Sequence, residues 1–243
     1  MLKARSALYN IAFYLNLSLW CLVAVPTLVL PRRYFLRVAR LWSVSSVWLL
    51  KAIAGTKVRW RGIDKLPQGG FIVAAKHQST WETFALFMLL KDPAFILKRE
   101  LMFIPFFGWY LIKGAMIPVR RGQTGREALG SMSSKARQAI AAGRQLVIFP
   151  EGTRRPVGAP PDYKSGVAHL YAATGAGCVP IALNSGLYWP RRALTRRPGT
   201  ISVEVLDPIG PGMRPKAFLG ELRSRLEQAS ERLVQEGRRE SGT

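Results

Sequence analysis

A histidine and a carboxylate stand five positions apart at the start of an apolar, helix-period segment. His77 and Glu82 belong to the run KHQSTWE, which directly follows the apolar run 71–75. Imidazole takes up a proton near neutral pH, and a nearby carboxylate can fix its tautomer and stabilise the imidazolium. The spacing therefore predicts a general-base pair on a strand-to-helix turn. The same residues also fit a capping box, with Ser79 as the cap and Glu82 reaching back to a free N–H.

The sequence offers no protein nucleophile to accompany this base. No G-x-S-x-G motif is present, and Cys178 has no sequence cue that links it to a base. We therefore expect no covalent enzyme intermediate, so that the nucleophile would be a hydroxyl of the substrate. His169, the other histidine, lies in an Ala/Tyr-rich segment and is interpreted as structural.

A glycine-containing basic turn follows the apolar run 145–149. Gly152 permits a tight turn with converging N–H groups, and Arg154 offers a planar fork suited to phosphate. Thr153 adds a hydroxyl, and Glu151 could accept a hydrogen bond from a substrate hydroxyl. Alone, this is an ordinary basic turn.

A second basic turn ends in Arg120, after the run 115–119. Alone, it is equally ordinary. Because carboxyl ends of neighbouring parallel strands meet at one edge of a sheet, the two turns together predict an anion clamp beside the histidine.

These residues require a scaffold of short strands alternating with helices. Apolar runs typical of strands cover 57–61, 71–75, 94–97, 115–119, 145–149, 179–183 and 201–206. Helix-period segments cover 80–90, 125–142, 165–174 and 215 to about 237. This alternation predicts an α/β fold with a mixed, largely parallel sheet flanked by helices.

The last predicted helix carries charges of both signs. We interpret them as a solvated face. The charges concerned are Glu221, Arg223, Arg225, Glu227, Glu231 and Arg232.

The composition combines an ordinary apolar content with an extreme charge. Of 243 residues, 49% are hydrophobic, and 36 Lys+Arg against 14 Asp+Glu give a formal net charge of +22. Such a charge favours a polyanionic partner: nucleic acid, an anionic membrane or a phosphorylated substrate. No recognition-helix or RNA-binding motif supports nucleic acid. Two distant cysteines, Cys21 and Cys178, exclude a disulfide scaffold and a thiolate zinc site.

The N-terminal segment is long and apolar. No charged residue lies between positions 6 and 31, and residues 11–30 would span roughly 30 Å as a helix. A secretory signal peptide is one alternative, but no A-x-A cleavage site follows. A buried core helix is another, because Asn10, Asn16 and Ser18 interrupt the apolar run.

Arginines follow this segment on one predicted helical face. Arg33, Arg37 and Arg40 have i, i+4, i+7 spacing and could meet lipid phosphates from an interfacial helix. Positive charge on both sides of the apolar run favours neither orientation of a span. We therefore expect a membrane-embedded helical hairpin within a membrane-anchoring segment, 1–56, followed by a catalytic domain, 57–243.

Taken in order, the motifs resemble those of the glycerolipid acyltransferase family over roughly residues 57–210. Its H-x4-D motif is matched by His77 to Glu82, and its F-P-E-G-T-R motif by Phe149 to Arg154 without change. Its Gly/Phe/Arg block is matched by 114–120 and its Val-Pro-Ile block by 179–181. The stretch 97–109 is also similar to a family segment, and the N-terminal apolar run is typical of the family.

The resemblance implies transfer of a fatty acyl group from acyl-CoA or acyl-carrier protein to the sn-2 hydroxyl of lysophosphatidic acid. His77, oriented by Glu82, would remove the hydroxyl proton. Arg120 and Arg154, with Lys98, would hold the phosphate, and residues 151–153 would shape the loop. No metal or cofactor is expected, because a thioester is already activated. The implied location is the cytoplasmic face of a bacterial inner membrane, with anionic lipid as a partner.

One departure from the family pattern leaves rival functions open. Glu82 stands where the family usually has aspartate, although its carboxylate could still reach His77. A same-family enzyme using another lysolipid acceptor, such as a lyso-ornithine lipid, has the same motifs. A catalytically inactive membrane lipid-binding protein is the rival from a different class. The sequence contains no signal for the identity of the acyl donor, for the preferred acyl-chain length or for the oligomeric state.

Overall fold

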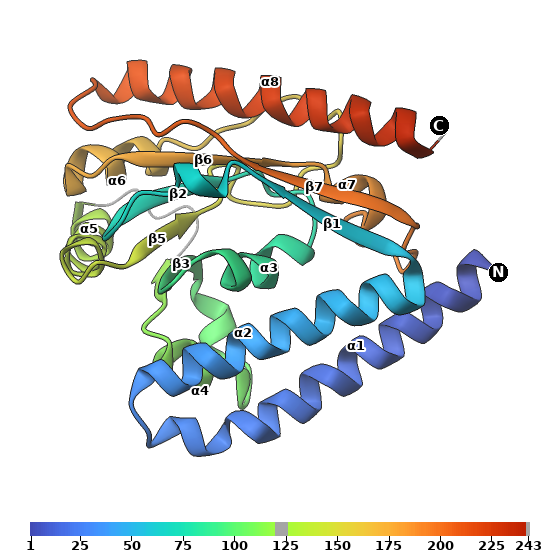
Figure 1. Cartoon of the computed structure of the whole chain (residues 1–243). Helices are drawn as coiled ribbons and strands as arrows, with labels where there is room; N and C mark the ends of the chain where they lie inside the picture. Colours follow the sequence, from blue (N-terminus) through green and yellow to red (C-terminus); the bar gives the residue numbers. More distant parts are fainter. Residues whose placement is uncertain (120–125, 242–243) are drawn as a thin grey trace.

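The computed structural model describes residues 1–119 and 126–241, and Figure 1 shows them as a twisted sheet with helices on both faces. Within this part of the chain, each predicted apolar run overlaps one strand. The strands are β1 Thr56–Arg61, β2 Phe71–Ala75, β3 Pro93–Lys98, β4 Ile117–Val119, β5 Gln145–Ile148, β6 Cys178–Leu183 and β7 Gly199–Val205. Short apolar runs between Gly- or Pro-containing turns favour strands that are buried on both faces.

The strand order in the sheet is β1-β7-β6-β2-β5-β3-β4. All neighbouring pairs are parallel except β6 and β7, whose register brings Ile181 opposite Val205. The predicted mixed, largely parallel sheet is therefore confirmed. Strand β2 lies between β5 and β6, with Val73 level with both Val147 and Val179.

Side chains of the central strands alternate between two apolar cores. Phe71, Val73 and Ala75 face the core on the side of the N-terminal segment, whereas Ile72 and Ala74 face the core on the other side of the sheet. This alternation is the ordinary consequence of a period of two residues in a strand. The helices around the sheet are α3 Trp81–Leu89, α4 Phe107–Lys113, α5 Arg126–Ala141, α6 Gly166–Thr174, α7 Ser185–Tyr188 and α8 Pro215–Ser241.

Helices α4 and α7 were not predicted from the sequence. They have seven and four residues, which is too short for a helical repeat of apolar positions to be recognisable. The longer helices α3, α5, α6 and α8 all match predicted segments.

Helix α8 corrects part of the sequence interpretation. An apolar stripe on it packs onto the sheet, and Figure 1 shows α8 lying along one face. The buried members of the stripe are Phe218, Leu222, Leu226, Ala229 and Leu233. Glu227, interpreted above as part of a solvated face, accepts hydrogen bonds from Lys76 Nζ and the Tyr163 hydroxyl instead.

Two N-terminal helices, α1 Leu2–Ala24 and α2 Arg32–Leu49, lie side by side under the opposite face of the sheet (Figure 1). A short 3-10 turn, Val25–Leu28, ends the first. Two of the three polar residues that interrupt the apolar run, Asn10 and Asn16, make contacts within the protein, whereas Ser18 is exposed. Asn16 Nδ2 donates to the hydroxyls of Ser45 and Ser46 in α2, each at 3.0 Å, and Asn10 donates to the Leu194 carbonyl.

The spacing predicted that Arg33, Arg37 and Arg40 share one exposed face of α2, but only two of them are exposed. Arg33 and Arg37 are exposed, with their guanidinium groups over the Tyr34 ring. Arg40 instead donates to the carbonyls of Phe87 and Leu90 at the end of α3. The reason is that the last carbonyls of a helix lack partners within the helix, and a cation satisfies them well.

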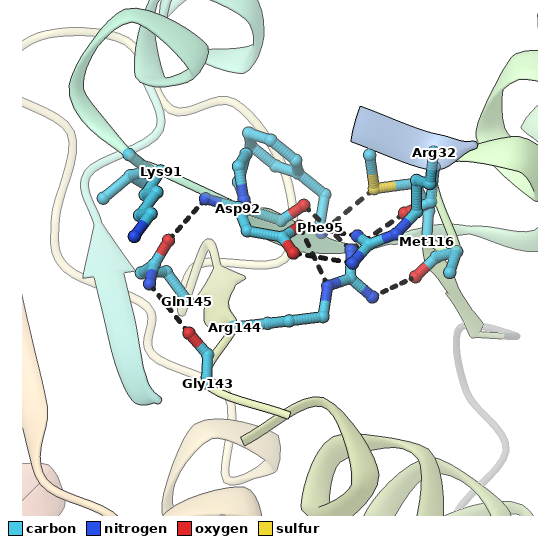
Figure 2. A network of polar contacts seen from close by, with 12 residues as sticks. Arg32, Lys91, Asp92, Phe95, Met116, Gly143, Arg144 and Gln145 are labelled. Atoms are coloured by element: carbon cyan, nitrogen blue, oxygen red, sulfur yellow. Dashed lines mark hydrogen bonds and ion pairs between the residues drawn. The ribbon is translucent and has the colours of Figure 1, made fainter. Parts of the chain in front are cut away.

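A charged cluster fastens the start of α2 to the sheet (Figure 2). Arg32 makes two hydrogen bonds to the Asp92 carboxylate, at 2.5 and 2.6 Å. Buried Arg144 donates to the same carboxylate at 3.1 Å and to the carbonyls of Gly114 and Ala115. This cluster lies at the amino ends of β3 and β5, away from the edge where a site is expected.

The N-terminal helices and the sheet share one apolar core. Helix α2 ends in a π-helical turn, Leu50–Ala54, and Gly55 adopts a left-handed conformation, φ 76°, that turns the chain into β1. Tyr9 and Phe13 of α1 are buried against Trp189 of the sheet domain. Residues 2–28 form a helical segment that is long and apolar enough to cross a membrane. Only 17% of its most apolar window is buried within the protein.

Candidate active site

The histidine occupies the carboxyl edge of the sheet. His77 follows β2 after one residue, Phe149 follows β5 directly, and Ser185 follows β6 after one residue. These three strands are neighbours and run parallel, so their carboxyl ends bring residues distant in sequence to one place. The predicted general-base pair therefore lies where such a fold places ligand sites.

The imidazole and its carboxylate are in direct contact. His77 Nδ1 lies 2.9 Å from Glu82 Oε1, and the Glu82 side chain is fully buried. An ionised carboxylate can only accept, so Nδ1 carries the proton in this contact. Nε2 is then the nitrogen that could accept a proton from a bound molecule.

Glu82 holds the loop as well as the histidine. Its Oε1 also accepts from the backbone N–H groups of Gln78 and Ser79, at 2.7 and 2.6 Å. Its Oε2 accepts from the Ser185 hydroxyl at 2.8 Å. The Glu82 carboxylate therefore makes the contacts that the capping interpretation and the general-base interpretation each require. The helix begins at Trp81 and has no capping bond from the Thr80 side chain.

An aromatic ring packs on the imidazole. The Phe149 ring stacks on His77 with centroids 4.1 Å apart and an interplanar angle of 18°. The His77 side chain is only 12% exposed. Packing on one side and a hydrogen bond at Nδ1 restrict the rotation of the ring, which is what a general base needs.

The PEGTRR turn folds beside this pair. Gly152 takes a left-handed conformation, φ 65°, and its N–H donates to the Phe149 carbonyl at 2.9 Å. Arg154 Nη1 donates to the Thr80 hydroxyl at 2.5 Å. The backbone N–H of Arg155 donates to the His77 carbonyl at 2.7 Å. The PEGTRR turn, predicted to bind an anion, and the histidine loop are thus directly connected.

Glu151 lies beneath the histidine loop. Its side chain is 1% exposed, and its Oε2 accepts from the His77 backbone N–H at 2.9 Å. Its Oε1 accepts from Lys76 Nζ at 2.8 Å. Both oxygens therefore have partners within the protein, whereas the sequence had suggested a bond to a substrate hydroxyl.

Two of the three remaining predicted site residues, Lys98 and Thr153, lie along the same edge. Lys98, at the end of β3, pairs with Glu100 at 3.3 Å and is about half exposed. Thr153 borders the same cavity as His77. Arg120 lies outside the described residues, so its predicted position beside Arg154 stays a prediction.

A cavity of about 2060 Å³ connects the polar residues with the N-terminal helices. Apolar side chains of α1, α2 and α4 line one part, among them Trp20, Phe35, Trp42 and Tyr110. His77, Thr80, Lys98 and Arg154 line another part. Such a cavity can accept a long apolar group and place a polar, anionic end beside a base.

Several residues of the site were missed by sequence reasoning. Ser185 bonds Glu82 across 103 positions, and Lys76 bonds Glu227 across 151. Ser185 had a usable signal, because it follows a predicted strand and could have been expected at the sheet edge. Lys76 was adjacent to the histidine but had no motif of its own, and Glu227 resembled its exposed neighbours on α8.

The arrangement defines an α/β protein in which a histidine–carboxylate pair can activate a hydroxyl group beside a partly apolar cavity. Comparison with known proteins agrees with this class. The sequence profile of the Acyltransferase family matches residues 57–184. A Pseudomonas aeruginosa protein, 1-acyl-sn-glycerol-3-phosphate acyltransferase, is 35% identical over 95% of this chain and 90% of its own length. The chain therefore belongs to the acyltransferase family.

More distant relatives have the same described activity. A mouse protein, 1-acyl-sn-glycerol-3-phosphate acyltransferase alpha, is 27% identical over 85% of this chain and 74% of its own. The crystal structure of the 1-acyl-sn-glycerophosphate acyltransferase from Thermotoga maritima has a TM-score of 0.79 with 23% identity, and covers 96% of this chain and 99% of that one. This last comparison shows that the fold is shared along nearly the whole chain.

Proposed function

We propose that this acyltransferase moves a fatty acyl group from a thioester, acyl-CoA or acyl-carrier protein, to the sn-2 hydroxyl of lysophosphatidic acid, forming phosphatidic acid. The observation that carries the proposal is the His77–Glu82 pair, 2.9 Å apart, on the wall of a cavity that has both an apolar and a cationic part. The described activity of the Pseudomonas relative supports the choice of acceptor.

In the reaction, His77 Nε2 takes the proton of the acceptor hydroxyl as its oxygen attacks the thioester carbonyl. The new ester bond forms as the carbon–sulfur bond breaks, and the imidazolium returns its proton to the departing thiolate. Glu82 stabilises the imidazolium through the bond to Nδ1. The thioester is already activated, so the proposal requires no metal or cofactor.

The acceptor phosphate would bind to Arg154 and Arg120, with Lys98 at the edge of the site. Arg154 now donates to the Thr80 hydroxyl, a neutral partner that a phosphate oxygen could replace. Gly152 and Thr153 would shape this loop, while Glu151 supports it from below.

We propose that the protein works at the cytoplasmic face of the bacterial inner membrane, on anionic lipid. The support is the exposed apolar surface of α1, where Leu15, Leu19 and Leu22 are each more than half exposed, and the net charge of +22. A lysolipid acceptor is itself a membrane component, so anchoring would bring the site to its substrate.

The test is an acceptor panel with the purified full-length chain in mixed micelles, using labelled acyl-CoA and acyl-carrier protein in parallel. Lysophosphatidic acid should be acylated with the highest kcat/KM. A preference for lyso-ornithine lipid or another lysophospholipid would instead assign a different acceptor. Binding of lysolipid without turnover on any acceptor would indicate an inactive lipid-binding protein.

Arg154→Ala tests the phosphate contact within the same assay. We expect the KM for lysophosphatidic acid to rise about tenfold to a hundredfold, because a hydrogen bond to a charged group contributes about 1.5–3 kcal/mol. Arg155→Ala is the matched control, since that side chain bonds the Pro160 carbonyl and faces Asp162. An unchanged acceptor KM in Arg154→Ala would contradict the assignment.

A further inference from the structure

A buried lysine beside the histidine joins three distant segments of the chain. The Lys76 side chain is 6% exposed, and its Nζ lies 2.8 Å from Glu151 Oε1 and 2.8 Å from Glu227 Oε1. The three residues come from the loop after β2, the turn after β5 and helix α8. An ammonium group held between two carboxylates in the interior satisfies charges that would otherwise be costly to bury.

The cluster extends to an aromatic hydroxyl. The Tyr163 hydroxyl donates to Glu227 Oε1 at 2.7 Å, and Lys76 Nζ lies 5.7 Å from the centre of the Tyr163 ring. Burial, together with the hydrogen bond to Glu227, raises the pKa of Tyr163 well above its usual range. The hydroxyl therefore stays a donor, and Glu227 is held from two sides.

The cluster reaches the histidine through Glu151. One oxygen of Glu151 accepts from Lys76 Nζ, while the other accepts from the backbone N–H of His77 at 2.9 Å. Rotation of this carboxylate would break both bonds at once. The orientation of the His77 backbone therefore depends on Lys76, and Lys76 depends on Glu227.

We propose that Lys76 and Glu227 are positioning residues, through which helix α8 holds the His77 loop in its reactive geometry. Glu227 lies beyond residues 57–184, the part that matches the family profile, so the site extends into the C-terminal helix. This proposal rests on the proposed role of His77 as general base. It also assigns Glu151 to support of the loop rather than to contact with substrate.

The deciding variant is Glu227→Ala, because alanine favours helix and the substitution removes one of the two carboxylate partners of Lys76 while Glu151 keeps its counter-charge. Lys76→Met is less suitable, since it would leave the buried Glu151 carboxylate without a counter-charge. Glu221→Ala is the matched control on the same helix. Its partner is Arg225, and both side chains are more than a third exposed.

Two measurements on the full-length chain test the proposal. Hydrogen exchange of peptides covering 76–80, without substrate, should become about tenfold faster in Glu227→Ala and stay unchanged in Glu221→Ala. In acyl transfer to the best acceptor, kcat should fall about tenfold to a hundredfold while the acceptor KM stays within about twofold, since a displaced base slows the chemical step.

The proposal is overturned if exchange of 76–80 is the same in both variants, if kcat is retained despite faster exchange, or if only KM changes. The exchange measurement does not depend on the acceptor. If the wild-type chain acylates no acceptor, the proposed function fails, while the exchange result still decides whether α8 holds the loop.

Discussion

At the scale of single residues, the site depends on one carboxylate with many partners. Glu82 accepts from His77 Nδ1, from two backbone N–H groups and from the Ser185 hydroxyl. Its place in the first turn of α3 also favours a negative charge, because free N–H groups point out of that end of the helix. The glutamate side chain therefore reaches His77 from this position in α3.

Replacing His77 tests the general base. We expect His77→Ala to lower kcat about 10²- to 10⁴-fold, with little change in the folded state, because the loop is held mainly through Glu82 and backbone bonds. Acyl-transfer kinetics and circular dichroism melting measure the two effects. His169→Gln, which removes the other imidazole, bonded to Ser133, is the comparison. Near-normal turnover in His77→Ala would rule out the mechanism.

At the scale of elements, charged clusters fix helices to the sheet at both of its edges. At the carboxyl edge, Lys76 connects the histidine loop with α8. At the amino edge, Arg144 and Arg32 share the Asp92 carboxylate and connect α2 with β3 and β5 (Figure 2). Burial lowers the pKa of the Arg144 guanidinium, an effect that the adjacent Asp92 opposes.

Removing Arg144 should weaken the fold rather than the chemistry. We expect Arg144→Met to lower the free energy of unfolding by about 3 kcal/mol, since the carbonyls of Gly114 and Ala115 lose their donor. Urea unfolding in detergent micelles measures this. The control is Arg59→Ala, whose ion pair with Glu240 has side chains 46% and 42% exposed and should contribute less than about 1 kcal/mol. Equal effects of the two substitutions on the free energy of unfolding would contradict the stabilising role of the Arg144 cluster.

At the scale of the whole molecule, apolar exposure is concentrated on the N-terminal helices and the α4 region. Leu19 and Leu22 of α1 are 58% and 70% exposed, and Phe106, just before α4, and Trp109, within it, are 58% and 51% exposed. Large exposed apolar areas on a folded protein indicate an interaction surface. With a charge of +22, an anionic lipid surface fits both properties.

Polar substitutions on α1 test membrane attachment. We expect Leu19→Asp combined with Leu22→Asp to lower partitioning onto anionic vesicles more than about a hundredfold, because each buried leucine contributes about 1.5–3 kcal/mol. Cosedimentation with vesicles measures the partitioning. Added salt should also weaken binding of the wild-type chain, because it screens the attraction between its positive charge and anionic lipid. Met213→Asp, at a 38% exposed position on the opposite side of the sheet, serves as control. Undiminished vesicle binding of the double variant would argue against attachment through α1.

Much of the fold followed from local patterns. The apolar runs located the strands, because a buried strand needs only a short apolar segment between turn residues. The order of the motifs placed His77, Glu82 and the PEGTRR turn at strand ends. Helices α4 and α7 were missed because seven and four residues do not contain a recognisable period.

The sequence by itself determined the alternation of strands and helices, the histidine–carboxylate spacing and the family. Only the tertiary structure decided that Ser185 supports Glu82, that Arg40 caps α3 and that Glu227 holds Lys76. Backbone periodicity and contacts a few residues apart are encoded locally and can be recognised in the sequence. A hydrogen bond between residues 50 or more positions apart depends on how the strands and helices pack together, so neighbouring residues carry no sign of it.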